Sequence, residues 1–307
     1  MKKIISIIFS VLFLLCFQSA IFAYDFTAED VIPCDCCFVG KINIAGFFAQ
    51  PITSAILGEL TKDPKFQEIN GFCINAFNFD IKKDINNFYL VAPDSMDTKS
   101  NNNFYFVLDG NFDLSKLSNS LKSFEDFQFL DTGKGVKAAK YLKNNSYILL
   151  LSNKCLVITF NLGWFFNNIM NKNTCTFETY QCFRTLSPNY LISGFGKITE
   201  EIQNNIRDIS HYSSNLGSRY LFNLELSNNG ILALSVSALY TSGNRENNSK
   251  ARDFWNTFFL GIKEGMRKDN TKWGNLLSDF TISFDDKIMY LNLQKSLEEI
   301  MKTANSK

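Results

Sequence analysis

A hairpin motif in the second half of the chain restricts its fold to one with antiparallel strands. Two β-rich runs, at 219–226 and 231–240, flank the dipeptide Asn229-Gly230. Asn-Gly is favoured in two-residue hairpin turns because both residues tolerate positive φ. Strands joined by so short a turn must run in opposite directions. We therefore expect an antiparallel sheet in this half of the chain.

The other apolar patterns alternate between strand and helix periods along the whole chain. Asp113 is placed to cap a helix, and Ser296 with Glu299 forms a capping box before the last one. In the first half we expect strands at 41–46, 87–92, 104–108 and 136–142, a hairpin at 147–160, and helices from Pro51, from Asp113 and at 162–170. In the second half we expect a strand at 190–193, a helix at 198–209, a long helix around 254–266 and a hairpin at 280–293.

Each half therefore approximates the order β-α-β-β-α-β, which is typical of a ferredoxin-like unit. We predict an α+β protein with two tandem domains, each an antiparallel sheet backed by helices, with extra strands in the first. The segment 173–188 is polar, contains Pro188 and separates the two patterns. The predicted division is a leader at 1–23, a first domain at 24–172, a linker at 173–188 and a second domain at 189–307.

The first residues have the pattern of a secretory signal peptide. Lys2 and Lys3 precede an apolar run, and Ala23 stands before a polar restart. We predict cleavage after Ala23 and a secreted or periplasmic protein; an uncleaved anchor is the alternative. The mature chain shows no further run that is long and apolar enough to span a membrane.

The charges of the mature chain nearly balance. The full sequence has 31 basic and 30 acidic residues, and removing Lys2 and Lys3 leaves 29 against 30. Binding to nucleic acid needs a surplus of Lys and Arg on one face. We therefore expect no nucleic-acid partner.

Seven cysteines remain after the leader, and in an exported chain they favour disulfides. Cys175 and Cys182 are close enough in sequence to form a local bridge. Cys34, Cys36 and Cys37 form a cluster that could bind a soft metal as thiolates. A closed zinc site needs four well-placed ligands, but His211 is the only imidazole and no second cysteine pair has C-x-x-C spacing. We expect the cluster to be structural, with a thiol- or metal-dependent role as the alternative.

Catalytic residues are not identifiable in this sequence. His211 is the only histidine, so any Ser-His-Asp or Cys-His machinery would depend on it, and it falls off the apolar face of its predicted helix. We predict no catalytic residue and no cofactor. The protein is more consistent with a binding role than with an enzyme.

Aromatic residues on two predicted helices offer a candidate partner surface. Trp164, Phe165 and Phe166 occupy consecutive helical positions, so one core contact cannot bury all three side chains, and Trp255 lies in a similar cluster. Core packing between the sheet and a neighbouring domain is the interpretation that we favour for both clusters, and an exposed share would mark a binding site. From these features we expect a non-catalytic exported protein that binds a protein partner, self-associates or is associated with the envelope. A carrier of an apolar ligand is a further alternative.

Overall fold

A computed structural model describes most of the chain after residue 25. The described residues are 26–33, 36–50, 53, 62, 64–77, 79–92, 103–132, 136–170, 190–197, 204, 219–227, 229–239, 245–268, 271–285 and 288–305. Among them, no helix is both long and apolar enough to cross a membrane.

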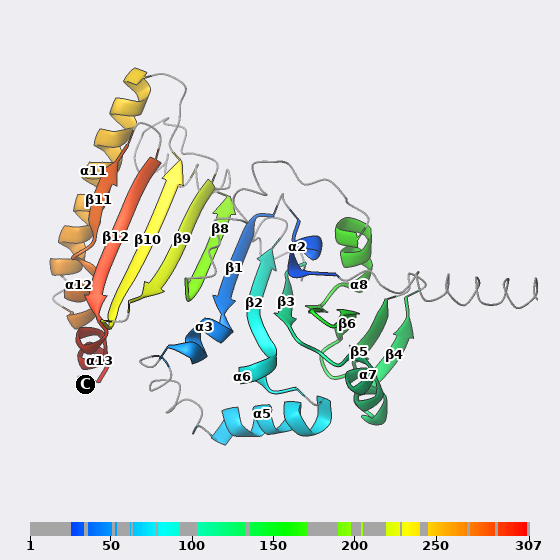
Figure 1. The fold of residues 1–307 in the computed structure, drawn as a ribbon. Coiled ribbons are helices and arrows are strands. Elements are labelled where there is room, and N and C mark those ends of the chain that lie inside the picture. Colours follow the sequence, from blue (N-terminus) through cyan, green and yellow to red (C-terminus); the bar gives the residue numbers. More distant parts are fainter. Residues whose placement is uncertain are drawn as a thin grey trace, which may run out of the picture.

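One continuous antiparallel sheet of twelve strands organises the fold (Figure 1). Its order is β11-β12-β10-β9-β8-β1-β2-β3-β7-β6-β5-β4. The strands of the first half are β1 (Phe38–Asn43), β2 (Ile85–Ala92), β3 (Tyr105–Gly110), β4 (Phe127–Asp131), β5 (Lys137–Tyr141), β6 (Ser146–Ser152) and β7 (Cys155–Thr159). Those of the second half are β8 (Ile192–Lys197), β9 (Arg219–Leu226), β10 (Ile231–Leu239), β11 (Thr281–Phe284) and β12 (Ile288–Ser296).

Helices pack on both faces of this sheet. The described helices are α2 (Ala28–Val31), α3 (Ile44–Ala49), α5 (Pro64–Phe77), α6 (Ile81–Asp84), α7 (Leu114–Ser123), α8 (Leu162–Phe165), α11 (Arg245–Lys268), α12 (Lys272–Leu277) and α13 (Leu297–Asn305). A π-helical turn, η1 (Phe166–Met170), continues α8. α11 and α12 lie beside the β11 end of the sheet, and α7 lies near the β4 end (Figure 1).

The predicted α+β class, with a large antiparallel sheet, is confirmed. The ferredoxin-like arrangement is not confirmed, because the sheet runs without a break from β11 to β4. β1 pairs with β2 on one side and with β8 on the other, so that Lys41 lies opposite Ser193. β1, the first strand of the described residues, therefore joins the two halves, which the order of elements did not reveal.

The predicted hairpin and helix caps form, but the turn differs in detail from the expected one. The backbone N–H of Ser227 donates to the Ile231 carbonyl, so the loop is longer than two residues, and Asn229 does not have a positive φ. The Asn229-Gly230 hairpin forms between β9 and β10, and Gly230 has a φ of 74°. The Asp113 side chain accepts from the backbone N–H of Lys116 at the start of α7. Ser296 and Glu299 form the predicted box before α13, with the backbone N–H of Ser296 donating to Glu299 at 3.0 Å.

Several predicted boundaries differ from the structure. The predicted strand at 41–46 is wrong in its second part, because α3 begins at Ile44 with the Asn43 side chain as its cap. β4 was not predicted. The helices expected from Pro51 and at 198–209 lie outside the described residues except for isolated positions.

A main core fills the face of the sheet that carries α2, which we call the α2 face. Val39, Val91, Val107 and Val157 each have 0% of their surface exposed there. α2, α8 and η1 contribute to the same cluster. Burying side chains of this size stabilises the fold by roughly 1.5–3 kcal/mol each.

The opposite side, which we call the α11 face, carries two separate clusters. Toward β4, Leu117 and Leu121 of α7 pack with Leu150 and Leu156. Toward β11, Trp255 of α11 packs with Ala238 and Met289, together with partly buried aromatic rings. Because side chains alternate between the two faces of a strand, the strand register assigns both clusters to one face.

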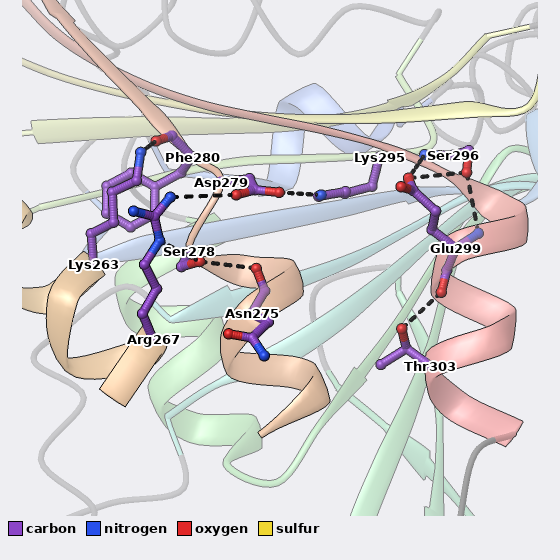
Figure 2. Close-up of polar contacts among 10 residues, drawn as sticks. All are labelled: Lys263, Arg267, Asn275, Ser278, Asp279, Phe280, Lys295, Ser296, Glu299 and Thr303. Atoms are coloured by element: carbon purple, nitrogen blue, oxygen red, sulfur yellow. Dashed lines mark hydrogen bonds and ion pairs between the residues drawn. The ribbon is translucent and has the colours of Figure 1, made fainter. Parts of the chain in front are cut away.

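A group of charged side chains connects the end of α11 with the segment after α12 and with β12 (Figure 2). Lys295 contacts the Asp279 carboxylate at 2.5 Å, and Arg267 approaches its other oxygen at 3.8 Å. Lys263 donates to the backbone carbonyl of Phe280. The hydrogen bond from Lys295 is the main cause that lowers the pKa of Asp279. Half of the Asp279 side chain is exposed, so each pair contributes little to stability.

Removing one buried hydroxyl should test how α2 is held. The Tyr105 hydroxyl donates to the Val31 carbonyl at 2.6 Å inside the core. Tyr105→Phe leaves that carbonyl without this donor, so we expect a loss of about 1–3 kcal/mol in the free energy of unfolding. Urea denaturation measures it. Tyr147→Phe, on a partly exposed side chain of β6, is the control and should change stability by less than about 0.5 kcal/mol. Equal effects of the two changes would contradict this role of Tyr105.

Candidate apolar binding surface

The central strands have faces that differ sharply in exposure. On the α2 face, Tyr105 and Val107 of β3 are each 0% exposed. On the α11 face, Phe106 of the same strand is partly exposed, and Phe104, just before it, is 37% exposed. The same alternation holds at the end of β2, and in β7 it holds only at Ile158, which is partly exposed between the buried Val157 and Thr159. Large apolar side chains at the centre of the α11 face therefore keep contact with solvent.

We call this region the central band. Its members are apolar side chains of β1, β2, β3, β7 and β9, or of residues next to these strands, and they lie between the α7 and α11 clusters. They are Phe38, Phe88, Leu90, Phe104, Phe106, Ile158, Phe160 and Phe222. All are partly exposed except Phe104, which is exposed.

Ring contacts connect the phenylalanines of the central band into two groups. Phe88 and Phe106 stack with centroids 5.3 Å apart, and Phe104 contacts Phe160 at 5.2 Å. Phe38 and Phe222 stack across β8 at 6.0 Å. This contact passes over Gly194 and Gly196, whose missing side chains leave room for the rings of Phe222 and Tyr220. The glycines of β8 thus shape this part of the surface.

The aromatic helix predicted as a partner surface is mostly internal. Phe165 is 0% exposed and Phe166 is 6% exposed, and both belong to the main core. Trp164 is partly exposed and packs against that core. On the second aromatic helix, Trp255 is 4% exposed. Phe254, Phe258 and Phe259 of the same helix are partly exposed. Accessible aromatic surface is therefore found both on α11 and on the sheet face, where Phe104 is more exposed than any of these rings.

The cysteine cluster is described only in part. Cys36 and Cys37 are buried, and the Cys36 thiol donates to the Pro33 carbonyl. Cys34, Cys175 and Cys182 lie outside the described residues, so the Cys175–Cys182 bridge stays a prediction. In the part of the chain that the structure describes, no three His, Cys, Asp or Glu residues are grouped to hold a metal ion. His211 also lies outside that part.

Burial suppresses the reactivity of two other thiols. It raises the pKa of Cys155 to about 12 and that of Cys73 to about 11. Alkylation needs the thiolate, so both should react slowly near neutral pH. Cys155 is fully buried in β7, whereas Cys73 of α5 is partly exposed.

We expect Cys155 in the folded protein to be alkylated at least about tenfold more slowly than Cys73 at pH 8. Peptide mapping after timed alkylation measures both thiols separately from the other cysteines. In urea the two rates should converge, because the difference comes from burial. Rapid labelling of Cys155 without denaturant would contradict its position in the core.

A buried polar pair lies on the α2 face. Lys41 is 7% exposed, and burial is the main cause that lowers its pKa, against the opposing charges of Asp109 and Glu29. Ser193, opposite Lys41, is 0% exposed, and its hydroxyl has no hydrogen-bond partner among the residues that the structure describes. A buried hydroxyl without a partner costs roughly 1–3 kcal/mol. Sequence reasoning did not single out either residue, because only the pairing of β1 with β8 brings them together.

Comparison with known proteins places the fold among solved structures. No family model and no curated protein matches the sequence. The structure of TP0453 in crystal form III matches with a TM-score of 0.52 and 8% identity, covering 93% of this chain and 100% of that chain. TP0453 in crystal form IV gives a TM-score of 0.47 at 10% identity, covering 94% and 99%. At 8% identity, the first match shows a similar fold and nothing about function.

Proposed function

We propose that the chain is an exported, non-catalytic binding protein that holds an apolar partner on the central band. The observation that carries the proposal is the difference between the two faces of the central strands. Val107 of β3 is fully buried, whereas Phe106 next to it is partly exposed. An apolar surface that stays accessible in the monomer is typical of an interaction site.

Export is part of this proposal and rests on the leader pattern. The expected locations are the periplasm or the outside of the cell, with an association with the envelope. The division into units at 24–172 and 189–307 also stays a proposal.

Two kinds of apolar partner fit the central band. Phenylalanine rings spread over a sheet face suit a protein partner, because aromatic residues are enriched at interfaces. The second candidate is an apolar ligand carried between the sheet and the helices, because the rings of Phe88, Phe104, Phe106 and Phe160 form one connected apolar group that such a ligand could contact. A thiol- or metal-dependent role of Cys36 and Cys37 has less support, because both are buried.

Site-specific photo-crosslinking tests the proposal. A photoreactive amino acid at Phe104, which is 37% exposed, reports on the central band. The same amino acid at Leu260, 48% exposed on α11, is the control. Crosslinking in the cells that export the protein should give adducts at position 104 that position 260 does not give.

The mass of the adduct separates the two candidates. A discrete increase of protein size supports a protein partner, and an increase of a few hundred daltons supports a small apolar ligand. The same adducts at positions 104 and 260, or none at either, would overturn the proposed use of the central band. Secretion of the cleaved chain, checked from its N-terminal sequence, tests export separately.

A further inference from the structure

We draw no further inference here: the strongest candidate beyond the central band, the buried pair Lys41 and Ser193 on the α2 face, leaves no exposed atom of Ser193 for a ligand to reach, and one internal water would satisfy its hydroxyl.

Discussion

Replacing Phe165 by alanine should lower the free energy of unfolding by about 3–5 kcal/mol. Its ring is 0% exposed and meets Tyr105 edge to face at 5.2 Å, so the change leaves a cavity in the main core. The loss is a large part of the stability of an ordinary domain. Urea denaturation followed by tryptophan fluorescence and by circular dichroism measures it.

The neighbouring Trp164 provides a control on the same helix. It is only partly buried, so Trp164→Ala should cost clearly less than Phe165→Ala. If Phe165 instead formed a partner surface, its removal would leave unfolding unchanged and weaken binding. Unchanged stability of the Phe165→Ala protein would therefore contradict its assignment to the core.

Replacing Gly194 by alanine should also destabilise the protein strongly, by about 2–3 kcal/mol. An added Cβ would meet the backbone carbonyl of Val39 in β1 and the ring of Phe222 in β9. A backbone atom of a paired strand cannot move aside cheaply, so the contact between β8 and β1 must loosen. Thermal and urea unfolding measure the loss.

The same substitution elsewhere gives a matched control. Gly261 lies within α11, and an added Cβ there meets nothing within 4 Å. Gly261→Ala should therefore stabilise the protein by about 0.5–1 kcal/mol, because glycine is a poor helix former. If both glycine variants shifted stability in the same direction, the tight packing around β8 would be refuted.

Local signals in the sequence identified most strands and the helix caps. The Asn229-Gly230 turn, the Asp113 cap and the Ser296 box each depend on a few adjacent residues, and all three form. The pairing of β1 with β8 depends on residues far apart in sequence. Periodicity reports how a strand is exposed, not which strand lies beside it, so the single sheet was not predictable in this way.

The central band was missed for a related reason. The sequence offers the aromatic helix at 162–170 as a candidate partner surface and does not single out any residue of the central band. The run Phe104-Tyr105-Phe106-Val107-Leu108 is apolar at both alternating positions, which is typical of a strand with two apolar faces. Which face of the strand is covered depends on where α2 and α11 pack, and only the tertiary structure shows the positions of these helices.

Because β1 lies between β2 and β8 in the sheet, its two strand pairings must form one after the other during synthesis of the chain. One edge of β1 can pair with β2 soon after both strands are synthesised. The other edge stays unpaired until β8, which begins at Ile192, has been synthesised. Until then that edge offers unpaired backbone groups, which invite pairing with other chains. Contacts so distant in sequence form slowly. The unfinished chain therefore passes through an aggregation-prone stage that a chaperone could shield.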